Sequence, residues 1–291
     1  MPAADHVVRA MTNDGAFRIV AARTTDTVAG VVRAQEARGE DARILGELVT
    51  GAILYRETMA PTLRVQCLLR GAGETGQLVG DSHPDGWARG LLKKGRSTRM
   101  VDLAGEGALL QLTRSLPTGQ NHTGTVAIPE DGKLASAFMA YFDRSEQITT
   151  LVSVATVLDD SGDAPRVVAA GGFLVQILPE AKDLAGPLAV MTLRLEDFLD
   201  LGPRLVDTDA SPDHLVEEVF YGMEHTRLGD SPLRFGCNCS RERVMAGFAT
   251  LRRADIEELV EEGEPLETRC DYCGSLYLIE PELLRGLLAS S

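Results

Sequence analysis

Alternating apolar and polar positions predict a sheet-rich region in the first 180 residues of the chain. Residues 63–70 alternate most clearly, and a glycine turn follows at 71–73. Short apolar runs separated by turn residues between 85 and 128 predict a meandering sheet. The glycine pair Gly171 and Gly172 indicates a bulge or a close approach of two backbones. Strands are predicted at 16–22, 63–70, 77–80, 147–157 and 166–178, with only a short leader before the first.

Helical periodicity interrupts this pattern. Residues 24–38 contain few helix breakers, and the apolar positions in 44–59 recur at helical spacing, which predicts an amphipathic helix that ends before Pro61. A shorter helix is predicted at 135–145, where bulky apolar residues cluster. Because helices and strands are mixed in this way, we predict an α+β domain for residues 1–180.

The composition changes after this domain. Residues 181–230 are charged and helix-prone, and their apolar positions repeat at helical spacing. We interpret this segment as a helical linker. Its apolar side needs a surface to pack against, and the outer face of the N-terminal sheet is the best candidate. Residues 231–291 then form a small C-terminal domain.

Charge and hydropathy exclude several classes of partner. The chain has 291 residues and a formal net charge of −14, from 29 basic and 43 acidic residues. This charge repels a phosphate backbone, so we expect no nucleic-acid partner. No apolar run approaches the roughly 20 residues that span a bilayer, and the N-terminus carries no basic and apolar leader. We therefore expect a cytoplasmic protein with no membrane partner, in a compartment that keeps thiols reduced.

Four of the five cysteines lie in the last fifth of the chain, as the pair Cys237 and Cys239 and the pair Cys270 and Cys273. Two thiol pairs at the ends of a short helical segment can converge on one tetrahedral metal site, and a shell of four thiolates favours zinc. The same sulfurs can be oxidised. The site is therefore either purely structural or a sensor that loses its metal when its ligands form disulfides. Cys67 alternates with apolar residues and is predicted to be a core thiol.

The segment between the two cysteine pairs predicts two short helices. Ser240 is a suitable N-cap for the first, and the second, at 255–260, ends near Gly263. A domain of about sixty residues cannot build a large core and usually needs a cross-link, which a bound metal would supply. Removing the metal or oxidising its ligands should therefore unfold most of residues 231–291.

Other candidate sites have simpler explanations. The five histidines are scattered and show no metal-ligand spacing. Ser145 has no base placed by the sequence to activate it, which favours a capping or packing role. The glycine-rich stretch 71–76 lacks the Gly-Lys-Ser/Thr ending of a phosphate-binding loop. We therefore predict a protein that is not an enzyme, with no catalytic or cofactor-binding residues beyond the cysteine site.

Five segments carry motifs in a recognisable order. Near the C-terminus these are CNCSRER at 237–243 and CDYCG at 270–274, followed by Tyr277. Upstream they are LGEL at 45–48, YFDRSEQ at 141–147 and AAGGFLVQILP at 169–179. Together these segments resemble the heat shock protein 33 family of redox-regulated chaperones. The resemblance covers nearly the whole chain, and the combination is far more specific than any one motif.

The resemblance implies an ATP-independent holdase that is inactive while it is reduced and holds one zinc ion through Cys237, Cys239, Cys270 and Cys273. Oxidation would join Cys237 to Cys239 and Cys270 to Cys273 and release the zinc. The C-terminal domain and the linker would then unfold, and the protein would favour a homodimer. The surface exposed in this way would bind unfolding client proteins under oxidative stress.

Two other functions fit the cysteine spacing. A zinc-ribbon regulatory or interaction protein would bind its partner in the zinc-loaded state and lose that activity with the metal. A dithiol oxidoreductase would instead turn over disulfide substrates. Metal dependence distinguishes the first alternative from a chaperone, and turnover distinguishes the second.

Overall fold

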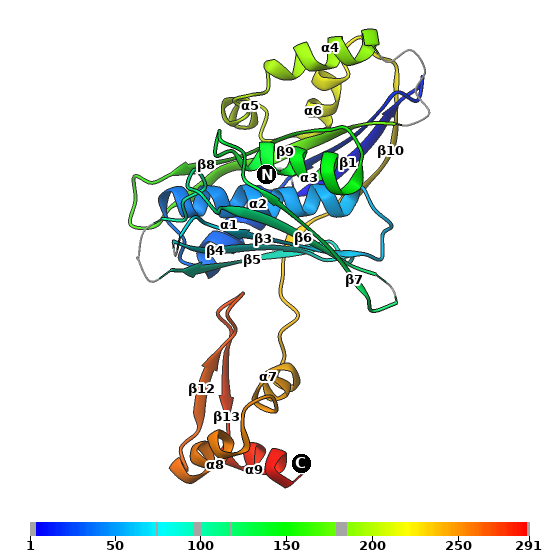
Figure 1. The fold of residues 1–291 in the computed structure, drawn as a ribbon. Helices are drawn as coiled ribbons and strands as arrows, with labels where there is room; N and C mark the ends of the chain where they lie inside the picture. The colour runs from blue at the N-terminus through cyan, green and yellow to red at the C-terminus, as the bar shows by residue number, and fades with distance from the viewer. Residues whose placement is uncertain (1–3, 74, 96–99, 117, 179–184, 290–291) are drawn as a thin grey trace. The chain divides into compact units, whose positions relative to one another are not determined.

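The chain was studied as a computed structural model, which describes residues 4–73, 75–95, 100–116, 118–178 and 185–289. These residues form two compact units, Met1–Phe235 and Gly236–Ser291 (Figure 1). Pro179 and the first residues of the predicted linker, 181–184, lie outside the described residues.

The first unit contains both helices and strands. Its strands are β1 (His6–Thr12), β2 (Phe17–Arg23), β3 (Arg64–Arg70), β4 (Gly76–Ser82), β5 (Trp87–Lys94), β6 (Leu109–Ser115), β7 (Asn121–Ala127), β8 (Thr150–Asp159), β9 (Arg166–Ile177), β10 (His225–Pro232) and β11 (Arg234–Phe235). Its helices are α1 (Thr25–Ala34), α2 (Gly39–Glu57), α3 (Leu134–Tyr141), continued by the π-helical turn Phe142–Glu146, α4 (Ala185–Glu196), α5 (Gly202–Asp207) and α6 (Pro212–Val219). The predicted α+β class is confirmed.

The strands form two sheets. The first has the order β10-β1-β2-β9-β8 and the second the order β11-β5-β4-β3-β6-β7. Neighbouring strands are antiparallel except for β11, which pairs in parallel with β5. The run β5-β4-β3-β6-β7 is the predicted meander, and β3 buries Val65, Cys67 and Leu69 on alternate positions as its pattern predicts. Gly172 marks a close approach, because a Cβ added there would lie 2.4 Å from the Ser153 carbonyl oxygen.

Helix α2 lies between the two sheets (Figure 1). The predicted helix that ends before Pro61 is confirmed, but it is buried on all sides from Ala42 to Glu57, apart from partial exposure at Arg43, so its predicted amphipathic character is wrong. The physical reason is that each sheet covers one side of the helix. Side chains such as Leu48 and Ile53 therefore belong to one continuous core with residues of both sheets.

Strands β1, β10 and β11 were not predicted. Strand β1 replaces the expected leader, and β10 occupies residues that were expected to be helical. The two pair with each other, from His6 with Pro232 to Thr12 with His225. Their pairing adds an edge to the first sheet that only residues far apart in the sequence can form.

Helices α4, α5 and α6 cover the face of the first sheet that points away from α2 (Figure 1). Their apolar side chains Met191, Leu205 and Leu215 join a second core cluster with sheet residues such as Ile19 and Phe173. The expectation that this segment packs on the outer face of the sheet is confirmed for the described residues.

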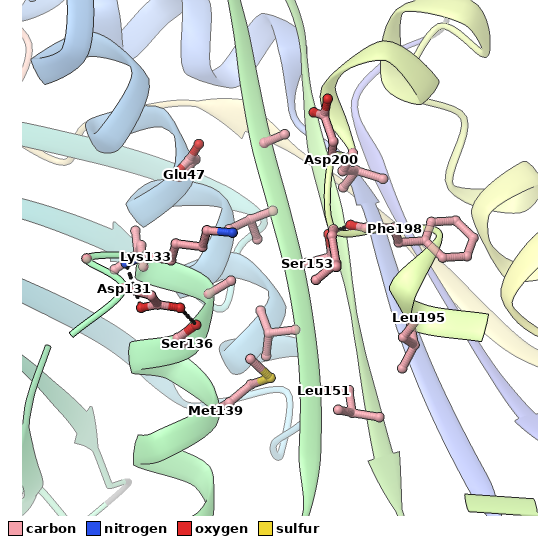
Figure 2. Close-up of a pocket in the computed structure, with 18 of the residues that line it drawn as sticks. Glu47, Asp131, Lys133, Ser136, Met139, Leu151, Ser153, Leu195, Phe198 and Asp200 are labelled. Atoms are coloured by element: carbon pink, nitrogen blue, oxygen red, sulfur yellow. Dashed lines mark hydrogen bonds between the residues drawn. The ribbon is translucent and has the colours of Figure 1, made fainter. Parts of the chain in front are cut away.

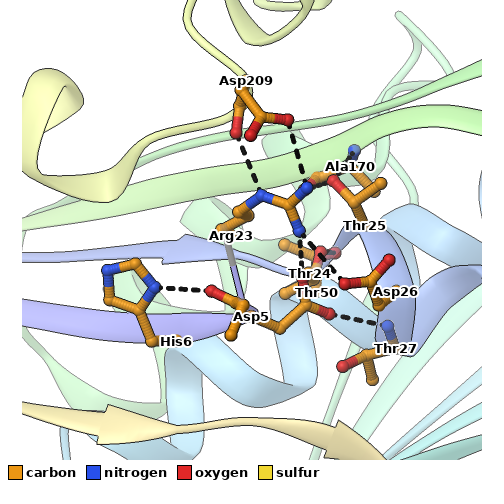
Figure 3. A network of polar contacts seen from close by, with 11 residues as sticks. Asp5, His6, Arg23, Thr24, Thr25, Asp26, Thr27, Thr50, Ala170 and Asp209 are labelled. Atoms are coloured by element: carbon orange, nitrogen blue, oxygen red, sulfur yellow. Dashed lines mark hydrogen bonds and ion pairs between the residues drawn. The ribbon is translucent and has the colours of Figure 1, made fainter. Parts of the chain in front are cut away.

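A buried arginine connects this helical layer to the sheet (Figure 3). Arg23, at the end of β2, is only 2% exposed. Its Nη1 lies 2.6 Å from Asp5 Oδ1, and its Nε donates to the Asp209 carbonyl at 3.0 Å. The other Asp5 oxygen accepts from the backbone N–H of Thr27 at 2.6 Å. One guanidinium therefore joins the N-terminal segment, β2 and the turn between α5 and α6.

The second unit is small. Its elements are α7 (Arg241–Phe248), α8 (Arg253–Glu262), β12 (Leu266–Arg269), β13 (Leu276–Ile279) and α9 (Pro281–Ala289). Strands β12 and β13, which were also not predicted, form an antiparallel hairpin. The buried apolar side chains of its core are Ile256, Ile279 and Leu284, and partly buried side chains such as Phe248 and Leu266 pack against them. Such a small core supplies little of the stability that a folded domain needs.

Candidate metal centre

The structure brings the four C-terminal cysteines together. Cys237 and Cys239 precede α7, whereas Cys270 and Cys273 lie in the turn of the β12–β13 hairpin. The four Sγ atoms all lie within 4.8 Å of one another. The separations across the two pairs are 3.7 Å between Cys237 and Cys270 and 3.4 Å between Cys239 and Cys273. Segments that are distant in sequence thus present four sulfurs to one point.

Local backbone features hold both pairs in place. The hydroxyl of Ser240, the predicted N-cap of α7, accepts from the backbone N–H of Arg243 at 3.3 Å. This cap orients the chain directly after Cys239. In the hairpin, Cys270 N donates to the Ser275 carbonyl at 2.9 Å, and Gly274 N donates to the Cys270 carbonyl at 2.8 Å. Gly274 has a φ of +72°, a conformation that glycine adopts without strain.

The sulfur geometry fits a tetrahedral metal ion. An ion bound at about 2.3 Å from each of four sulfurs separates those sulfurs by about 3.8 Å. The observed separations of 3.7 and 3.4 Å approach this value. Within the described part of the chain, no other set of three or more histidine, cysteine or acidic side chains converges in this way. A shell of four thiols is a donor set that zinc favours.

The thiols differ in acidity. Burial raises the pKa of Cys270 to about 12, although backbone N–H groups of the turn act in the opposite direction. Burial also raises the pKa of Cys239, against the effect of the Tyr277 hydroxyl, which donates to its Sγ at 3.0 Å. For Cys273, hydrogen bonds from Ser275 and the neighbouring thiols outweigh burial and lower the pKa to about 7. Of these three thiols, Cys273 is the most easily ionised and so the most reactive toward oxidants or metals.

Comparison with known proteins identifies the family of the chain. The model of the Hsp33 protein family matches residues 5–280. The chain belongs to the Hsp33 family. The 33 kDa chaperonin of Syntrophotalea carbinolica is 28% identical over 98% of this chain and 99% of its own length. The 33 kDa chaperonin of Thermus thermophilus is 30% identical over 97% of this chain and 86% of its own.

The fold is also that of a solved Hsp33 structure. The crystal structure of the 33 kDa chaperonin from Thermotoga maritima, an Hsp33 homolog, superposes with a TM-score of 0.83 and covers 99% of both chains at 21% identity. The predicted resemblance to the heat shock protein 33 family is therefore confirmed. In the described residues, no helix is both long enough and apolar enough to cross a membrane.

The fifth cysteine lies apart from this centre. Cys67 on β3 is fully buried in the main core, as predicted from its alternation with apolar residues. Burial raises the pKa of its thiol far above the ordinary range. A neutral, inaccessible thiol of this kind is inert toward oxidants.

A cavity of about 510 Å³ lies beside the edge strand β8 (Figure 2). Helix α3 and the residues after α4 form its walls, and Glu47 of α2 reaches it. The Ser153 hydroxyl donates to the Phe198 carbonyl at 2.9 Å, and the Ser136 hydroxyl donates to Asp131 at 2.6 Å. The described residues that line this cavity include no histidine or cysteine. The cavity therefore offers no serine or cysteine nucleophile activated by a histidine base.

Glu47 makes the stability of the first unit dependent on pH. Burial raises the pKa of this carboxyl to about 7, although Arg43 lowers it by its charge. Between about pH 4.5 and 7 the folded chain holds a proton that the unfolded chain has lost, so the free energy of unfolding falls as the pH rises. We expect Glu47→Gln to raise the free energy of unfolding by about 2–3 kcal/mol at pH 8 and to change it little at pH 4.

Urea unfolding of both forms at these two pH values measures this difference. Glu40→Gln is the matched control, because Glu40 lies on the same helix and pairs with the same arginine. A hydrogen bond from Arg43 lowers the pKa of Glu40, so its substitution should lower stability at pH 8. An equal gain from Glu47→Gln at both pH values would contradict the proposed cause.

Proposed function

We propose that this member of the Hsp33 family is a redox-regulated, ATP-independent holdase that binds unfolding proteins in the cytoplasm under oxidative stress. The observation that carries the proposal is the convergence of four thiols in a unit with only a small apolar core of its own. The names of the 33 kDa chaperonin relatives support a chaperone role and give no indication of catalysis.

In the reduced state, Cys237, Cys239, Cys270 and Cys273 hold one zinc ion. When bound, zinc keeps the four thiolates deprotonated and cross-links the segment before α7 to the hairpin turn. Ser240 and the turn hydrogen bonds orient the two cysteine pairs for this role. The cross-link stabilises residues 236–291, and the protein is inactive in this form.

Oxidation removes the cross-link. Cys237 joins Cys239 and Cys270 joins Cys273, and each disulfide forms as two thiolates give up two electrons, which one hydrogen peroxide accepts together with two protons from solvent to give two waters. Disulfide sulfurs lie about 2.05 Å apart, so they can no longer surround a metal ion. Without the four thiolates the cross-link would be lost, and the second unit would unfold because its small apolar core cannot hold it.

Activation exposes an apolar surface that clients bind. Only Gly236 separates β11 from Cys237, so unfolding of the second unit loosens the end of the first. If α4 to α6 follow, the sheet residues of the second core cluster, among them Phe17, Ile19 and Phe173, become accessible. A surface of this kind binds unfolded chains, and it favours a homodimer of the oxidised protein.

An aggregation assay tests the proposal. A thermally unfolding client protein should aggregate in the presence of the reduced chain and remain soluble with an equimolar amount of the peroxide-treated chain. Zinc release, followed with a chromogenic chelator, should precede this gain of activity. A zinc-ribbon protein would lose binding as zinc leaves, and an oxidoreductase would turn over disulfide substrates. Equal suppression of aggregation by both forms, or by neither, would rule out redox activation.

A further inference from the structure

A second cavity, of about 500 Å³, lies in the first unit where β1 and β2 meet the C-terminal end of α2. Three arginines line it: Arg9 from β1, Arg18 from β2 and Arg56 from α2. Nothing in the metal centre or in the proposed holdase function uses these residues. Three guanidiniums in one cavity need an explanation in a chain whose net charge is −14.

Strand register places Arg9 and Arg18 on the inner face of the first sheet. Arg9 pairs with Val20, and Arg18 pairs with Met11. Arg9 and Arg18 are therefore diagonal neighbours on one face of the sheet, the face on which Val7 and Val20 pack toward α2. Both arginines thus occupy positions that hold core residues elsewhere along the same strands.

The carboxylates in this cavity do not balance the arginines. Glu57 accepts hydrogen bonds from both Arg9 and Arg56. Arg18 donates to neutral oxygens, the Thr58 carbonyl at 3.3 Å and the side chain of Gln176. The side chain of Asp85, the other acidic residue of the lining, is 72% exposed and lies 3.5 Å from His83. Apart from the exposed Asp85, the cavity lining therefore holds three arginines and one carboxylate.

Two of the arginines also retain buried donors without a partner. Arg56 is only 4% exposed, and its Nε has no hydrogen-bond partner in the described structure. The Nε of Arg18 is likewise buried and unsatisfied. Burial, followed by the charge of Arg9, lowers the pKa of Arg56 to about 10. Three guanidiniums beside one buried carboxylate leave positive charge uncompensated, so an anion in the cavity would stabilise the folded chain.

We propose that this cavity binds a phosphate group, either as a free oligophosphate or as part of a small phosphorylated molecule. A phosphate oxyanion carries the two negative charges that the cavity lacks, and arginine binds it through paired N–H donors. A volume of about 500 Å³ exceeds the needs of one phosphate and lies within the range of small-molecule sites. The proposal is independent of the holdase function.

Isothermal titration calorimetry of the reduced, metal-loaded full chain tests this site with inorganic phosphate, pyrophosphate and AMP at matched ionic strength. We expect saturable binding of one ligand per chain, with acetate as a weak monoanion control. Tighter binding of pyrophosphate than of AMP identifies an oligophosphate site, and the reverse order identifies a site for a phosphorylated small molecule.

Substitutions of the arginines that line the cavity test whether the phosphate binds there. Arg56→Gln and Arg9→Gln should each weaken the preferred ligand at least about tenfold, because each removes charged donors from the cavity. Arg166→Gln is the matched control, since Arg166 forms an exposed pair with Asp159 outside the cavity. If Arg56→Gln fails to fold, the part-exposed Arg9 still provides the test. No saturable binding of any phosphate, or equal affinities in all three variants, would overturn the proposal.

Discussion

Removing the metal from the reduced chain is expected to unfold residues 236–291 while the two sheets of the first unit remain folded. The reason is the imbalance within the second unit, where four converging thiols accompany a core of only three buried apolar side chains among the described residues. Structural zinc contributes roughly 10–16 kcal/mol of apparent binding free energy in small domains, which far exceeds what such a core supplies. Circular dichroism before and after chelation should show loss of the helical signal of α7 to α9, with the remaining signal retained.

Substitutions distinguish the loss of bound metal from other causes of unfolding. Cys273→Ser should reduce the bound zinc, measured by elemental analysis, and should make residues 236–291 sensitive to limited proteolysis. Cys67→Ala is the matched control, because Cys67 is buried in the first unit and lies outside the metal centre. It should leave the metal stoichiometry unchanged. A Cys273→Ser chain that resists proteolysis as well as the unsubstituted chain would show that the metal does not maintain the fold of this unit.

The cluster of four cysteines could be predicted from the sequence because its information is local. Each cysteine pair lies within one short segment, and Ser240 caps the helix that follows the first pair. Only the convergence of the two segments needed the structure. The alternation of apolar and polar residues also identified β3 from the sequence, because one face of that strand is buried and the other face is more exposed.

The first sheet was harder to predict because its edge depends on distant residues. Strand β10 forms the edge of this sheet by pairing with β1, a partner more than two hundred positions away, as the pairing of Val7 with Ser231 illustrates. For α2, periodicity predicted the helix but not its burial on all sides. A helix between two sheets is buried on both sides, and its environment depends on strands that come later in the chain. Buried arginines such as Arg56 gave no signal, because burial of a charge depends on tertiary partners.

Replacing Arg23 with leucine is expected to lower the free energy of unfolding of the first unit by about 3–5 kcal/mol, because removing one partner of a buried pair leaves the other charge uncompensated. The side chains of Arg23 and Asp5 are only 2% and 1% exposed. Burial raises the pKa of the Asp5 carboxyl, so its ionised form depends on the arginine and the Thr27 N–H. Urea unfolding at pH 7 measures the loss. The exposed pair of Arg166 with Asp159 provides the control, and Arg166→Leu should change stability little.

A double substitution identifies the source of this loss. Adding Asp5→Asn to Arg23→Leu removes the uncompensated carboxylate, so part of the lost stability should return. The stability that is not recovered measures how much Arg23 contributes by holding the turn between α5 and α6. Arg23 donates there to the Asp209 carbonyl at 3.0 Å. Hydrogen exchange should then be faster in α5 and α6 than in the unsubstituted chain. If the double variant is as unstable as Arg23→Leu and exchange in these helices is unchanged, Arg23 acts through packing alone and does not hold the helical layer on the sheet.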